Sequence, residues 1–68
     1  MYTEVIKTSY KMYITVTNQW GGTEQLTVID LENGKKQIYK SILNVPEQVI
    51  KDIVVARSVY GSVGHSGR

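Results

Sequence analysis

Hydrophobic and polar residues alternate over residues 10–17 with the two-residue period of a β-strand. One side of such a strand would carry Tyr10, Met12, Ile14 and Val16, and the other Lys11, Tyr13, Thr15 and Thr17. This period predicts a half-buried strand. The next residues, 18–22, include Gly21-Gly22 and predict a loop, because paired glycines weaken any regular element.

A hairpin is predicted next, with a strand over 24–31 and a tight turn at Asn33-Gly34. A two-residue type I′ turn needs positive φ at both central residues, which Asn and Gly accept. Counting outward from this turn pairs Leu26 with Ser41 and Val28 with Tyr39. Both faces of the hairpin would carry apolar side chains, and one helix can cover only one of them. We therefore expect a dimer or a complex, with a homodimer paired through the helix or through the second apolar sheet face as the preferred form.

A helix start is predicted at residues 44–47. Asn44 can cap free backbone N–H groups, Pro46 suits the first helical turn, and Glu47 lies three residues after Asn44, as in a capping box. Apolar residues then recur at helical spacing as far as Tyr60, and Gly61 is a suitable residue to end the helix.

An alternative remains open for the second half of this helix. Ile53-Val54-Val55 are β-branched and lose χ1 freedom in a helix, so a short helix over 45–51 and a fourth strand over 53–60 would also fit. The preferred interpretation is an α+β fold, a three-stranded antiparallel β-sheet with one α-helix packed on a face, paired as a homodimer. It comprises a single domain over 1–61, and the Gly/Ser-rich residues 62–68 are expected to form a disordered tail.

The composition is that of a small globular domain, with 68 residues, a net charge of +2 and no cysteine. A domain of this size buries only ~60% of the surface of its unfolded chain, which again favours oligomerisation. No apolar run approaches the ~18 residues of a membrane span. The start of the chain, Met1–Glu4, lacks the basic and apolar regions of a secretion signal, so a cytoplasmic protein is expected.

Residues that could support catalysis are few and scattered. His65 is the only histidine and has no carboxylate or nucleophile near it in the sequence. Asp30 and Glu32 would share a strand face, but a solvated strand end beside Lys35 explains them. We therefore expect no enzyme activity, no metal site and no cofactor.

Binding of single-stranded nucleic acid is the alternative function. It rests on aromatic and basic residues that a sheet surface could bring together, as single-strand binders do: Tyr13, Trp20, Tyr39, Lys11, Lys36 and Lys40. Domains built on phosphate contacts usually carry a larger basic surplus than +2.

The segment Gly34–Val49, continuing to Ile53, resembles the bacteriophage uracil-DNA glycosylase inhibitor family. In that family a strand ending Glu-Ser-Ile-Leu leads, after two residues, into Pro-Glu and a short helix with Val three residues after the Pro. Here the corresponding residues read Lys40-Ser41-Ile42-Leu43 and then Pro46-Glu47, with Val49 in the helix. The small dimeric inhibitors of protein-primed Bacillus phages share a similar plan.

The resemblance implies a protein that occupies the DNA-binding cleft of a bacterial uracil-DNA glycosylase in the cytoplasm of a phage host. Carboxylates and a strand edge would replace DNA phosphates, and an apolar pocket would take the leucine with which the enzyme probes DNA. Lys40 departs from the family's Glu, and the chain is not acidic overall. The partner-binding residues expected from the resemblance and the pocket are Leu26, Val28, Tyr39, Lys40, Ser41, Ile42, Glu47, Val49 and Ile53. An interaction module with another target is a third possibility.

Overall fold

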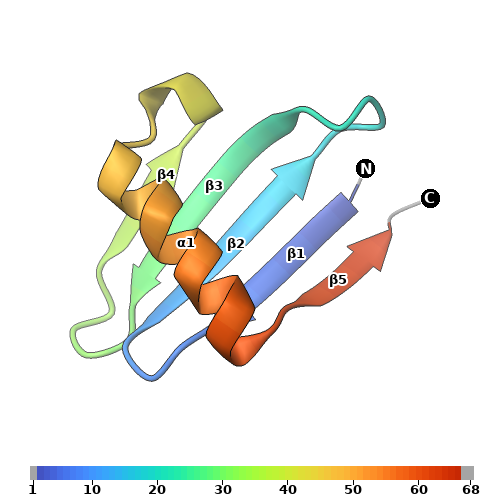
Figure 1. Ribbon diagram of the computed structural model, residues 1–68. Coiled ribbons are helices and arrows are strands. Elements are labelled where there is room, and N and C mark those ends of the chain that lie inside the picture. The colour runs from blue at the N-terminus through green and yellow to red at the C-terminus, as the bar shows by residue number, and fades with distance from the viewer. Residues whose placement is uncertain (1, 67–68) are drawn as a thin grey trace.

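The computed structural model describes residues 2–66, with side chains described for 2–64, and places one helix across one face of an antiparallel sheet (Figure 1). The strand order is β4-β3-β2-β1-β5. The elements, in chain order, are β1 (Tyr2–Lys7), β2 (Lys11–Thr17), β3 (Thr23–Asp30), β4 (Lys36–Tyr39), a 3₁₀ helix η1 (Ile42–Asn44), α1 (Glu47–Tyr60) and β5 (Val63–Ser66). The α+β class and the single helix packed on a face are confirmed.

The sheet has five strands, so the prediction of three was wrong. β2, β3 and β4 are the predicted strands, and β1 was missed. β1 is joined to β2 by a tight turn in which the Thr8 hydroxyl accepts hydrogen bonds from the backbone N–H groups of Tyr10 and Lys11. A local Thr turn of this kind is a weaker sequence signal than Asn-Gly, which explains the omission.

The β3–β4 turn is wider than the predicted type I′ turn. Gly34 has a φ of 74°, but no other residue type in the described chain has positive φ, so Asn33 does not. The Asp30 carboxylate instead accepts bonds from the N–H groups of Glu32 and Asn33, which makes a four-residue loop. The register moves by two residues, and Leu26 pairs with Tyr39. A two-residue shift keeps every side chain on its predicted face.

The helix begins and ends close to the predicted positions, but its cap differs. Asn44 ends η1, whose first residue is preceded by Ser41, and the Ser41 hydroxyl accepts from the N–H of Leu43. Pro46 is the N-cap of α1 and makes no side-chain cap bond. The capping-box prediction was therefore wrong. The helix runs unbroken to Tyr60, which excludes the alternative strand over 53–60.

The last strand corrects a further expectation. Residues 63–66, which lie in the segment predicted to be a disordered tail, form β5 and pair antiparallel with β1. Residues 67–68 lie outside the described residues. Gly61, with a φ of 74°, ends α1 as predicted and turns the chain back toward β1.

The core lies between α1 and one face of the sheet. It contains only six buried side chains, and these are Ile6, Tyr13, Leu26, Val45, Ile53 and Ala56. The helix therefore covers the side of β2 that carries Tyr13 and Thr15. No helix within residues 2–66 is long and apolar enough to cross a membrane.

The opposite face of the sheet, called here the open face, has no described element over it (Figure 1). Strand alternation and register place seven aliphatic or thioether side chains there: Val5, Met12, Ile14, Val16, Ile29, Ile38 and Val63. The more apolar side of β2 is thus the uncovered side.

Leu26 is the best test of this core, because it is 1% exposed and lies on the central part of the sheet under α1. We expect Leu26→Ala to lower the free energy of unfolding by about 3 kcal/mol, through lost burial and a residual cavity. Urea unfolding followed by circular dichroism measures this. Leu43→Ala is the matched control, since Leu43 is 91% exposed and its loss should change stability by less than about 0.5 kcal/mol. Equal effects of the two changes would contradict the described core.

Candidate functional site

An apolar groove lies between the sheet and the N-terminal half of α1. Its volume is about 190 Å³, and its walls come from β2, β3, η1 and α1. The lining residues are Thr15, Thr23, Leu26, Ile42, Ile50, Ile53, Val54 and Arg57. The chain leaves the sheet after Tyr39 and passes through η1 before α1 begins. The groove therefore lies between η1, α1 and the first half of β3.

The groove has a buried floor and an exposed rim. Leu26 and Ile53 are buried and form the floor, whereas Ile42, Ile50 and Val54 are between 37% and 57% exposed. Aliphatic carbon of η1 and α1 therefore faces solvent at the rim of the groove. An apolar group placed in it would cover these side chains and gain by leaving water.

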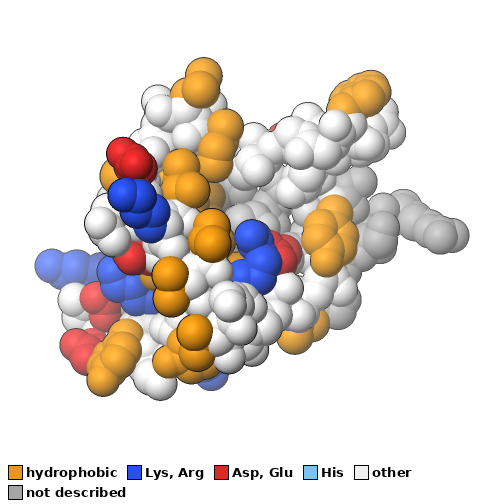
Figure 2. All heavy atoms as spheres, in the orientation of Figure 1, with side chains coloured by type: hydrophobic (Ala, Val, Ile, Leu, Met, Phe, Trp, Pro, Cys, Tyr) orange, Lys and Arg blue, Asp and Glu red, His pale blue; other side chains and the backbone are white. Residues whose placement is uncertain are grey.

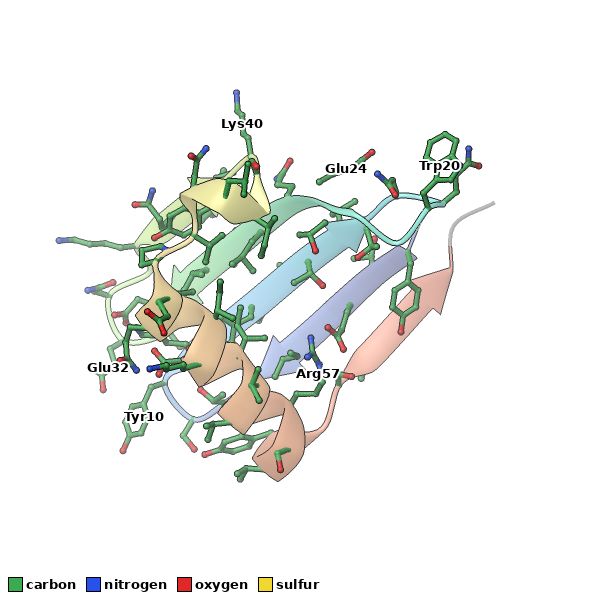
Figure 3. The ribbon with its side chains drawn as sticks, turned by 45° about the horizontal axis from the view of Figure 1, so that its top comes forward. Tyr10, Trp20, Glu24, Glu32, Lys40 and Arg57 are labelled. Carbon is green, nitrogen blue, oxygen red and sulfur yellow. The ribbon has the colours of Figure 1, made fainter. Side chains whose placement is uncertain are left out.

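One wall of the groove carries an ion pair between α1 and β1. The Arg57 Nη2 lies 2.7 Å from Glu4 Oε1, and Nε donates to Oε2 at 3.1 Å. Figure 3 shows Arg57 pointing from the helix over the sheet. The two hydrogen bonds from Arg57 lower the pKa of the Glu4 carboxyl, and burial opposes them. This two-point contact holds α1 at a defined position across the sheet.

Three of the expected partner-binding residues meet in the groove, namely Leu26, Ile42 and Ile53. Val28, Tyr39 and Val49 pack against the core without lining the groove. The remaining three, Lys40, Ser41 and Glu47, have other surroundings. Ser41 caps η1, Glu47 forms an exposed ion pair with Lys51 at 3.4 Å, and Lys40 projects away from the sheet (Figure 3).

Sequence reasoning missed five of the groove's residues. Ile50 and Val54 are one helical turn apart, and this spacing could have shown that they share a side of the helix next to Ile53. Thr15, Thr23 and Arg57 have no such signal, because their positions depend on how α1 crosses the strands.

The aromatic residues do not form the surface that the nucleic-acid alternative requires. Tyr13 is 4% exposed, so its ring cannot stack on a base, and Tyr39 is partly buried against the core. Burial also raises the pKa of the Tyr13 hydroxyl. Trp20 is 82% exposed and stands at the tip of the β2–β3 loop (Figure 3), whereas Tyr13 lies in β2 and Tyr39 in β4.

The charges are divided unequally between the two sides of the molecule. Helix α1 and the strand positions that face it carry four carboxylates and three cations, a net charge of −1, and hydrophobic side chains lie between them (Figure 2). These charged residues are Glu4, Asp30, Glu47, Asp52, Lys11, Lys51 and Arg57. The strands of the open face contribute Lys7 and Lys36 instead. The groove is thus on the more acidic side of a basic protein.

The described part of the chain was also compared with the requirements of a metal site and with known proteins. In that part, no group of three or more His, Asp and Glu side chains could hold a metal ion. Comparisons with family models, curated proteins and solved structures gave no match. The groove, its ion pair and the surrounding charges are therefore the observations from which a function can be inferred.

The Glu4–Arg57 pair should make stability depend on pH. A carboxyl whose pKa is lowered by folding stabilises the folded state above its unfolded value, here 4.5, and that stabilisation is lost as the pH falls through the folded value. We expect Glu4→Gln to cost about 1 kcal/mol at pH 7, a figure reduced because Arg57 is half-exposed, and to cost almost nothing near pH 3.

Urea unfolding at both pH values measures the difference. Glu24→Gln is the control, because Glu24 is an exposed carboxylate for which no ion pair is described, and it should change stability little at either pH. A loss for Glu4→Gln that is the same at pH 3 and pH 7 would show that the charge is not the cause.

Proposed function

We propose that this chain is a protein inhibitor that blocks the DNA-binding cleft of a uracil-DNA glycosylase by direct protein–protein contact. The observation that carries the proposal is the apolar groove beside α1. A cleft that accepts DNA offers an apolar probing side chain within a basic surface. The groove offers a place for the apolar side chain, and the carboxylates around it on the helix side suit the basic surface.

The size of the groove supports a protein partner. Sites for small-molecule ligands usually span ~300–1,000 Å³ and enclose most of the ligand. A groove of about 190 Å³ with one open side is smaller, and suits a single aliphatic side chain presented by another protein. Such an anchor, surrounded by less important contacts, is the usual form of an interaction hot spot.

The position of the groove agrees with the family resemblance. The resemblance covers residues 34–53, and Ile42, Ile50 and Ile53 within it line the groove. The family's pocket mechanism needs apolar residues between the helix and the sheet, and these residues supply them. The distribution of charge partly offsets the lack of overall acidity, because the carboxylates are concentrated on the groove side.

The proposed inhibitor is not an enzyme, and it acts as a homodimer in the cytoplasm of a phage host. A homodimer is proposed because six buried side chains are a small core for 68 residues, and two apolar surfaces remain uncovered. These surfaces are the outer side of α1 and the open face of the sheet.

Val54 gives the direct test of the groove. It is 57% exposed and lines the groove, so Val54→Asp should leave the fold intact while placing a carboxylate where the partner's apolar side chain would dock. The unaltered protein should abolish uracil excision by bacterial uracil-DNA glycosylase at near-stoichiometric ratio. Val54→Asp should weaken inhibition at least about tenfold. Excision of uracil from a labelled oligonucleotide measures both.

Val59→Asp is the matched control. Val59 is on the same helix and 68% exposed, but it lies outside the groove, so this variant should inhibit as the unaltered protein does. Full excision in the presence of excess unaltered protein would exclude the proposed target. Inhibition that follows binding to the DNA substrate, and fades steeply with added salt, would favour the nucleic-acid alternative.

A further inference from the structure

The open face of the sheet is a surface with no described cover and a strongly apolar centre. Its residues come from all five strands, and the register aligns one row across the sheet: Val63, Val5, Ile14, Thr27 and Ile38. Among the described strand residues that have a register partner, no carboxylate lies on this face, and its cations, Lys7 and Lys36, are in the row at one end. The centre of the face is therefore free of charge.

We propose that a second copy of this chain covers the open face, so that two sheets pack face to face and both grooves point outward. This inference rests on the proposed homodimer, not on the proposed target. A second copy is favoured as the partner for two reasons. The small core leaves the fold in need of further burial of apolar surface, and other copies of the chain are present wherever it folds.

Area decides between the two uncovered apolar surfaces. A sheet of five strands spaced ~4.8 Å apart and ~20 Å long offers ~480 Å² on one side, so two copies bury ~1,000 Å². That value reaches the lower limit of specific interfaces. The outer side of α1, ~21 Å long and ~10 Å wide, gives only ~400 Å² for two copies, which is the range of incidental contacts.

The lysines determine the direction of the two-fold axis. Lys7 and Lys36 share the row with Met12 and Ile29 at one end of the face, and the opposite end carries Thr3, Val16 and Gln25. An axis parallel to the strands would place one lysine row over the other. An axis across the strands places each lysine row over the uncharged end of the partner. Like charges then stay apart, so the strands of the two copies run antiparallel.

Two substitutions at the centre of the open face test the interface. Ile14→Lys and Thr27→Arg place solvated cations on this face of a monomer, but bring two cations together in the proposed dimer. The unaltered protein should sediment as a dimer at about 50 μM, as expected for a small interface, and both variants as monomers. Thr27→Arg removes no core group, so it remains informative if Ile14→Lys fails to fold.

Val55→Lys is the matched control, because Val55 is 61% exposed on the outer side of α1, and this variant should remain a dimer. A monomeric unaltered protein would overturn the homodimer and its interface together. A dimer broken only by Val55→Lys would assign the interface to the helix and overturn the open-face inference. Neither result depends on the glycosylase assay, so failure of the proposed target is measured separately.

Cross-linking tests the direction of the axis, since the chain has no cysteine of its own. A mixture of Thr3→Cys and Lys7→Cys proteins treated with a short bis-maleimide should give cross-links between the two variants, because each end of β1 faces the other end in the partner. Dimers that yield no mixed cross-link would overturn the antiparallel arrangement.

Discussion

The packing of α1 against one side of the sheet is the contact on which the rest of the structure depends. It buries nearly every side chain of the core, and it is made by a helix of 14 residues on a sheet of five strands. A helix ~21 Å long and ~10 Å wide cannot cover a sheet ~24 Å wide. The groove and the exposed sheet ends follow from this mismatch in size.

The Glu4–Arg57 pair gives this packing a defined position. Hydrophobic contact alone is non-directional and would allow α1 to slide over the strands. A bidentate bond between a helix residue and a strand residue 53 positions apart restricts the crossing geometry. Arg57 of this pair also lines the groove, so the contact that orients the helix helps to shape the proposed binding site.

The two sides of the protein differ in charge and in whether a helix lies over the sheet. Each of these differences supports one of the two proposals. The helix side combines a shallow apolar groove with excess carboxylates, which suits a basic partner that presents one aliphatic side chain. The open face combines a larger apolar area with cations at one end, which suits burial against a copy of itself. A dimer formed in this way presents two identical grooves on opposite sides, and therefore two sites for the partner.

The sequence by itself determined the local elements of this protein. Alternation along β2, the Asn33-Gly34 signal and the apolar spacing before Gly61 reflect neighbouring residues, so β2, the β3–β4 hairpin and the helix could be predicted, whereas β1 and β5 were missed. The faces of the hairpin were also correct, because a register error of two residues leaves side-chain direction unchanged. Leu26 could therefore be predicted as a groove residue from the hairpin, Ile53 from helical spacing, and Ile42 from the family resemblance.

Only the tertiary structure decided which side of the sheet the helix covers. The apolar side of β2, with Met12, Ile14 and Val16, would be the natural choice for a core, yet α1 covers the side with Tyr13 and Thr15. That choice depends on where β1 and β5 add to the sheet and on the Glu4–Arg57 bond, which join residues distant in the chain. Local patterns carry no information on such pairings, so the five-stranded sheet, the groove wall and the open face could not be predicted.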